Sequence, residues 1–255
     1  MTPGFVRCFV IVSVVGISLV TVTPADEHSI WNGKIVQYGK MREAIGQQQD
    51  QGRVRLNYLT AHPHFYGVAA LAGLQGEVTI RDGKVTTTRV ASAGRLTVES
   101  ESLDLEATLL VGSYVPSWTT HSVNAPVAPA EFDTHIMTLA RKCGLIVSQP
   151  FPFLIEGEFS DVSLHVIHGA CPLHARLHKR ALPPELQPYE ADLKRLTGAV
   201  VGIYAVDAVG DITHPATSTH MHLLFVDPQS GENVTGHVEQ LGLLQNCVVR
   251  LPRVK

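Results

Sequence analysis

The sequence predicts an α+β, β-rich fold with mixed and antiparallel sheets in two closely packed subdomains and few helices. The 255 residues are 45% apolar and 17% charged, so the chain can bury a substantial core. Short apolar or alternating runs separated by turn-forming residues recur along it, as is typical of strands. One segment, residues 131–142, has a clear helical pattern.

The N-terminal 25 residues have the pattern of a signal peptide. Arg7 precedes an apolar run at residues 8–20, and small and polar residues follow up to Ala25. The run is shorter than the roughly 20 apolar residues that a membrane span needs. We therefore expect cleavage after Ala25, a periplasmic or secreted mature chain of residues 26–255, and no stable membrane association. A secreted chain whose mass begins at Met1 would contradict this.

Charge and cysteine content exclude some classes of function. The formal net charge of -3 and the absence of blocks of Lys and Arg give no electrostatic case for binding nucleic acid or an anionic membrane surface. After signal cleavage the chain keeps Cys143, Cys171 and Cys247, which allow at most one intramolecular disulfide. There is no Cys-x-x-Cys motif, which argues against a thiolate metal site.

The first half of the mature chain reads mainly as strands. Residues 40–49 favour a short helix, and a break follows at residues 51–53. Asp82-Gly83 is a strong two-residue hairpin signal. The strands that we expect here are residues 77–80, 85–90 and 96–111, followed by a connection at residues 115–129.

The second half begins with the clearest helix. Residues 131–142 carry an apolar stripe that includes Phe132 and Ile136, and Gly144 can end the helix. We expect strands at residues 145–147, 153–156, 159–167, 197–205 and 247–251, a turn at Glu156-Gly157, a loop or short helix within 165–180, and a partly helical segment at 186–196.

A histidine-rich hairpin lies near the C-terminal end. Residues 219–226 read as a strand that places His220 and His222 on one face, because successive side chains of a strand point to opposite faces. Residues 227–233 are dense in turn formers and return the chain so that His237 comes level with this pair. Three imidazoles can then converge on one point.

Three histidines with an open fourth position are typical of a catalytic zinc site. Chance is the alternative, since the chain holds 13 histidines, and each ring can simply be hydrogen-bonded. His62 and His64 form a second possible pair, but Pro63 between them disrupts the strand geometry that would aim both rings together. Glu77 alternates with apolar residues on its strand, and residue type alone favours a solvated face for it.

Three blocks of the sequence resemble the alpha-acetolactate decarboxylase family. Gly73-Leu74-Gln75-Gly76-Glu77 is similar to the family's Gly-Leu-Asp-Gly-Glu hairpin, and Ile155-Glu156-Gly157-Glu158-Phe159 to its Ile-Asp-Gly-x-Phe turn. The third block, from Thr197-Gly198 through His220-Met221-His222 to Gly236-His237-Val238, is the most specific. Together the blocks span most of residues 26–255, which the resemblance identifies as one acetolactate decarboxylase-like domain.

The resemblance implies that His220, His222 and His237 bind Zn²⁺ and that Glu77 is the active-site glutamate. The substrate would be 2-acetolactate or a related small hydroxy-keto acid. Its decarboxylation to acetoin would proceed through an enediolate whose charge the metal stabilises as a Lewis acid. Glu77 would deliver the proton if burial raises its pKa. A homodimer is also implied by the family alone.

Two positions depart from the family pattern. His165 stands where the family has the arginine of a Lys-Thr-Arg sequence, which makes His165 the candidate for substrate binding, with Arg176 or Arg180 as possible compensation. The family's tail glutamate has no counterpart before Lys255, and Glu239 and Glu232 are candidates by proximity.

Two other functions fit the same residues. A three-histidine zinc site also activates water, so an exported zinc hydrolase is one alternative. A non-enzymatic protein that binds a metal or a hydroxy acid is the other.

Overall fold

The computed structural model describes Met1 and residues 30–60, 62–91, 94–98 and 104–254. Apart from Met1, the expected signal peptide at residues 1–25 lies outside the described residues. In the part of the chain that is described, no helix is long and apolar enough to cross a bilayer.

The first sheet is built from the N-terminal half of the chain. Its strands run in the order β1-β7-β3-β4-β5-β6, β2 pairs with β7, and every pairing is antiparallel. The Asp82-Gly83 turn joins β4 to β5, as predicted. The bounds are β1 (Val36–Tyr38), β2 (Val54–Arg55), β3 (Phe65–Leu71), β4 (Glu77–Arg81), β5 (Lys84–Val90), β6 (Leu96–Val98) and β7 (Glu106–Tyr114).

The second sheet contains a closed ring of four strands. β10 pairs with β11, β11 with β12, β12 with β9, and β9 again with β10. β13 and β8 extend the sheet from β9, and all these pairings are antiparallel. The bounds are β8 (Trp118–Ser122), β9 (Phe151–Val166), β10 (Tyr189–Tyr204), β11 (Thr219–Val226), β12 (Asn233–Leu243) and β13 (Val248–Pro252).

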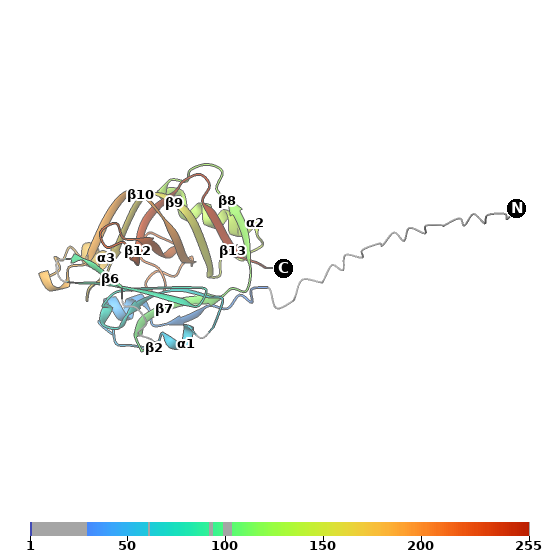
Figure 1. Ribbon diagram of the computed structural model, residues 1–255. Coiled ribbons are helices and arrows are strands. Elements are labelled where there is room, and N and C mark those ends of the chain that lie inside the picture. Colours follow the sequence, from blue (N-terminus) through green and yellow to red (C-terminus); the bar gives the residue numbers. More distant parts are fainter. Residues whose placement is uncertain (2–29, 61, 92–93, 99–103, 255) are drawn as a thin grey trace.

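The two sheets pack against each other and share one core (Figure 1). Val68 and Val111 of the first sheet belong to the same buried cluster as Phe153 and Leu223 of the second. Polar groups also cross the interface, where the Thr79 hydroxyl is hydrogen-bonded to that of Thr235. The predicted β-rich α+β class is therefore confirmed.

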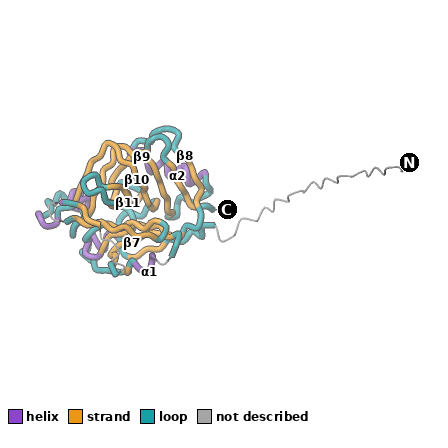
Figure 2. The backbone as a smooth tube through the Cα atoms, in the orientation of Figure 1, coloured by secondary structure: helices purple, strands orange, loops and turns teal. Residues whose placement is uncertain are grey.

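Helices are short and lie around the sheets (Figure 2). The predicted helix at residues 131–142 is confirmed as α2, whose apolar face buries Phe132, Ile136 and Ala140. The bounds are α1 (Asn57–Thr60), α2 (Phe132–Lys142) and α3 (Pro172–Leu177), with a π-helical turn η2 (Arg42–Gly46) and 3₁₀ turns η3 (Ala72–Leu74), η5 (Pro129–Glu131) and η6 (Pro184–Leu186).

Two predicted interruptions are wrong because β9 and β10 are long, continuous strands. Residues 186–196 were expected to be partly helical, but Tyr189 onward pairs with β9 along its length, and tertiary pairing overrides local propensity. Glu156-Gly157 is not a turn. Gly157 has a φ of 147°, and a Cβ there would lie 2.8 Å from Cys247 Sγ, so the glycine allows β9 to approach the residue that precedes β13.

Two other local predictions need correction. Residues 145–147 are not a strand, because they follow the C-terminal turn of α2: Gly144 has a φ of 81° and the Leu145 N–H donates to the Ala140 carbonyl. Residues 40–49 form only the π-helical turn η2 rather than a longer helix.

The Glu156 carboxylate joins the two sheets. It accepts hydrogen bonds from Arg81 of β4 and Arg250 of β13. Partial burial favours the neutral carboxyl, but these two guanidinium groups lower the pKa of Glu156 below its usual value. Because the pKa of Glu156 is depressed in the folded state, its ion pairs with the two arginines stabilise the fold at pH values above the unfolded-state pKa. This stabilisation is lost as the pH falls through the folded-state pKa.

We expect Glu156→Gln to lower the free energy of unfolding at pH 7 by about 1–2 kcal/mol, because two arginines lose a shared anion. The difference from the unmodified chain should shrink as the pH falls below about 4.5, the ordinary glutamate range. Urea unfolding at pH 7 and pH 3.5 measures both effects. Asp161→Asn, which removes an exposed pair with Lys194, is the control. An equal loss in both variants would contradict the assignment.

Candidate metal centre and active-site cavity

The histidine hairpin forms as predicted, with β11 and β12 joined by a tight turn. The Asp227 carboxylate accepts hydrogen bonds from the backbone N–H groups of Gln229 and Ser230 and from the Ser230 hydroxyl. The Gly231 N–H donates to the Asp227 carbonyl, with Gly231 at a φ of 72°. This turn fixes the register in which His222 lies directly opposite His237.

The structure brings the three predicted imidazoles together. Each of His220, His222 and His237 offers one ring nitrogen, and these atoms lie within 4.8 Å of one another. The rings are 7%, 1% and 6% exposed, and their centroids are 5.0–5.5 Å apart. Among the described residues, this is the group with the composition and spacing to hold a metal ion.

The donor set fits a metal such as zinc. Burial lowers the pKa of His222 to about 3, and burial together with neighbouring histidines lowers the pKa values of His220 and His237. The rings are therefore neutral near pH 7, which is the form that binds metals. His222 Nδ1 donates to the Val78 carbonyl at 3.0 Å, which leaves Nε2 as the free nitrogen. His220 Nδ1 is buried, and none of the residues that the structure describes is its hydrogen-bond partner.

Glu77 lies beside the three imidazoles. It is 2% exposed, its Oε2 is 3.5 Å from His222 Nε2, and its Oε1 accepts a hydrogen bond from the Ile167 N–H at 3.4 Å. Gly76 before it has a φ of 135°, and a Cβ there would lie 2.3 Å from the Thr88 carbonyl oxygen. Burial raises the pKa of Glu77 to about 8, against the opposing effect of the Ile167 hydrogen bond. The solvated strand face that residue type favoured is wrong.

His165 also belongs to this group of side chains. It lies on β9 directly opposite His237, and the two ring centroids are 4.9 Å apart. His165 Nδ1 is 2.8 Å from Glu239 Oε1, and Glu239 also accepts a hydrogen bond from Arg176. Burial favours the neutral form of Glu239, but His165 and Arg176 lower its pKa overall. Of the two acid candidates, Glu239 is therefore close to the site, whereas Glu232 is exposed in the hairpin turn.

Several of these residues line one cavity. Its polar lining includes Glu77, His165, His220 and His237. In the described part of the chain, no arginine or lysine lines it, so neither Arg176 nor Arg180 reaches the cavity. The rest of the lining is mainly apolar and includes Met41, Ile45, Leu74, Leu109 and Ile167.

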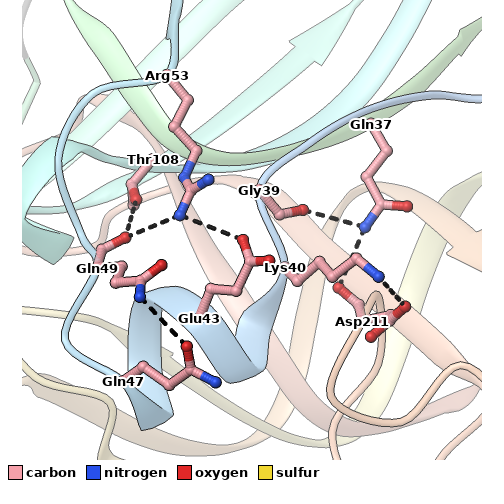
Figure 3. A network of polar contacts seen from close by, with 9 residues as sticks. All are labelled: Gln37, Gly39, Lys40, Glu43, Gln47, Gln49, Arg53, Thr108 and Asp211. Carbon is pink, nitrogen blue, oxygen red and sulfur yellow. Dashed lines mark hydrogen bonds and ion pairs between the residues drawn. The ribbon is translucent and has the colours of Figure 1, made fainter.

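A short segment that includes η2 covers one side of the cavity through Met41 and Ile45. A polar network holds it (Figure 3). Lys40 and Arg42 both pair with Asp211, and the Glu43 carboxylate pairs with Arg53. These ion pairs therefore fasten the segment to two loops, the one before β11 and the one before β2.

Comparison with known proteins places this architecture in a family. Residues 35–255 match the family model described as alpha-acetolactate decarboxylase. The chain belongs to the alpha-acetolactate decarboxylase family. Members of known structure have the same fold. The chain is 18% identical to alpha-acetolactate decarboxylase from Bacillus subtilis strain 168, with a TM-score of 0.64, over 87% of this chain and 86% of that one.

A second solved structure is equally similar. It is a Staphylococcus aureus protein of unknown function similar to alpha-acetolactate decarboxylase, with 17% identity, a TM-score of 0.62, and coverage of 87% of this chain and 86% of that one. A search of curated proteins found no match. At this level of identity the solved structures show the fold alone.

Sequence reasoning missed two residues at the cavity of this acetolactate decarboxylase family member. His214 lines the cavity with its ring centroid 5.2 Å from that of His237, and burial, helped by His165, lowers its pKa to about 4. Cys171 lines it as a free, buried thiol whose pKa burial raises to about 11. Each of them immediately precedes a proline and lies outside the strands and helices, so no strand or helix period relates them to the hairpin.

The second histidine pair that the sequence suggested lies elsewhere. The His62 ring packs edge-on against Tyr114, with centroids 5.5 Å apart. His64 has a φ of 68° and its Nδ1 is 3.3 Å from the Asp82 carboxylate. Neither residue lines the cavity, and the metal group within the described residues does not include them.

Proposed function

We propose that this protein binds Zn²⁺ through His220, His222 and His237 and decarboxylates 2-acetolactate, or a related small hydroxy-keto acid, to acetoin. The observation that carries the proposal is the convergence of three buried, neutral imidazoles beside the buried carboxyl of Glu77. Of these groups, His220, His237 and Glu77 line the same cavity. Membership of the alpha-acetolactate decarboxylase family supports the choice of reaction.

A bound zinc ion would act as a Lewis acid that stabilises negative charge on the substrate hydroxyl and carbonyl oxygens. The three imidazoles would hold the ion, and three protein ligands are the number that catalytic zinc sites use when they also bind a substrate. The apolar lining, including Leu109 and Ile167, limits the cavity to a small molecule and reduces its access to water.

Glu77 supplies the proton in this proposal. When the carbon–carbon bond to the carboxylate breaks, carbon dioxide leaves and the electron pair stays on the substrate carbon, which must then be protonated. Burial keeps the Glu77 carboxyl protonated near pH 7, and the carboxyl lies next to His222, beside the proposed substrate position. Solvent restores the proton after each turnover. His165, also in the cavity lining, donates or accepts a hydrogen bond at a substrate oxygen.

The direct test is the formation of acetoin from 2-acetolactate by the zinc-loaded protein, with enantiomers of the product resolved to exclude spontaneous decarboxylation. We expect turnover that a chelator removes and that zinc restores. Full zinc occupancy without acetoin formation would refute the reaction and leave the metal site intact.

A hydrolase is the second candidate, because no arginine or lysine in the described residues lines the cavity to hold a carboxylate. The same three imidazoles would then activate water, whose pKa on zinc can fall to about 7. Release of acid from a panel of small esters and lactones separates this reaction from decarboxylation. Ligand binding without either turnover would identify a binding protein.

We also propose that the mature protein is exported, on the basis of the apolar run after Arg7. The mass spectrum of the secreted chain, described above, tests this.

A further inference from the structure

His165 differs from the other histidines of the cavity in how its ring is held. Its Nδ1 is 2.8 Å from a carboxylate oxygen of Glu239, whereas His222 Nδ1 donates to a backbone carbonyl. A carboxylate can only accept a hydrogen bond, so Nδ1 of His165 carries the hydrogen. Nε2 is then the nitrogen of His165 that remains available to the cavity.

Glu239 is itself held by a second charged residue. Arg176 of α3 donates to the same oxygen, Oε1, that faces His165, and also to the Glu190 carboxylate. Glu190 lies on β10 directly opposite His165 on β9. Arg176 thus lies between two carboxylates from β10 and β12, the two strands of the closed ring that flank β9, and Glu239 cannot turn away from His165 without losing this contact.

The residues of this network become more exposed from His165 outward to Arg176. The His165 side chain is 2% exposed and that of Glu239 is 18% exposed, while the Arg176 side chain is half exposed and closes the network toward solvent. A histidine whose far nitrogen is bonded to a carboxylate keeps one ring orientation and one tautomer. Glu239 does not line the cavity, so any effect it has on a substrate acts through His165.

We propose that Glu239 and Arg176 are positioning residues that hold His165 with Nε2 toward the cavity, so that the site recognises a single hydroxyl or carbonyl oxygen of its substrate. An imidazole nitrogen makes one directional hydrogen bond, in contrast to the two parallel bonds that a guanidinium makes with a carboxylate. The inference rests on the proposed function for the identity of the substrate, but the orientation of His165 can be measured without turnover.

The test uses Glu239→Gln and Arg176→Met in the full mature chain. Glu158→Gln is the matched control, because it removes another Arg–Glu pair of the same sheet, the one with Arg195 between β9 and β10. In ¹⁵N-histidine-labelled protein, His165 is identified by the signals that disappear in His165→Gln. We expect the control to keep the hydrogen on Nδ1 of His165 and both test variants to shift its signals toward a mixture of tautomers.

The same variants should separate substrate recognition from metal binding. We expect zinc affinity, measured by chelator competition, to stay within about threefold, while kcat/KM for 2-acetolactate falls about 10- to 100-fold, the usual cost of losing an outer-shell partner. Unchanged His165 signals in both test variants would overturn the proposal. An equal loss of zinc affinity would also overturn it, since the residues would then support the metal site.

The two proposals fail in different ways. Shifted His165 signals in a protein that does not convert 2-acetolactate would refute the proposed reaction and retain the positioning role. Turnover of 2-acetolactate that is the same in all variants, with unchanged His165 signals, would refute the positioning role and retain the reaction.

Discussion

Replacing His222 by Ala is expected to abolish tight zinc binding. His222 is the most buried of the three imidazoles, it lies directly opposite His237, and its ring is fixed by the Val78 carbonyl. Loss of an outer-shell partner typically costs about 10- to 100-fold in metal affinity, and loss of a direct ligand should exceed the upper end of that range. Competition with a chromophoric chelator measures the affinity.

His62→Ala is the control for this experiment. His62 belongs to the other histidine pair of the sequence, is exposed and packs against Tyr114. We expect it to bind zinc as the unmodified chain does. Full zinc retention by the His222 variant would reject the assigned ligands, whereas a loss in both variants would point to a different site that includes His62.

Glu77→Gln is expected to retain zinc and lose nearly all turnover of 2-acetolactate. The amide has almost the shape of the carboxyl and fits the same buried space, but it cannot deliver a proton. Positioned acids typically contribute about 10²- to 10⁴-fold to a rate, so kcat should fall by that factor. Zinc content and kcat are measured on the same preparation.

Glu232→Gln is the matched control, since Glu232 is exposed in the turn between the two histidine strands. It should leave kcat unchanged. A Glu77→Gln variant with normal kcat would show that another group protonates the substrate. A variant without zinc would show that Glu77 supports the metal instead.

The candidate metal centre was predictable because its determinants are local. Alternation along β11 places His220 and His222 on one face, and the turn formers between Asp227 and Glu232 set the return that aligns His237. Both signals depend on residues that are adjacent in the sequence, so they can be recognised without knowledge of the tertiary structure.

The surroundings of the metal centre were less predictable because they depend on packing between distant segments. Glu77 is buried only because β4 lies against the second sheet, and its residue type alone indicated the opposite. His214 reaches the cavity from an irregular loop. Within the second sheet, a turn was expected at Glu156-Gly157 and a partly helical segment at residues 186–196, but pairing along β9 and β10 determines the structure there.

The closed ring of strands also has a kinetic consequence. His222 is paired with Val201 on one side and His237 on the other, and His237 is paired in turn with His165. Strands that are hydrogen-bonded along both edges open less readily than edge strands, so local fraying does not easily separate His222 from His237. A bound ion would have to leave through the cavity, past Met41 and Ile45. The lifetime of the bound ion would then depend on how often the short segment that includes η2, which is ion-paired to Asp211, moves away from the cavity.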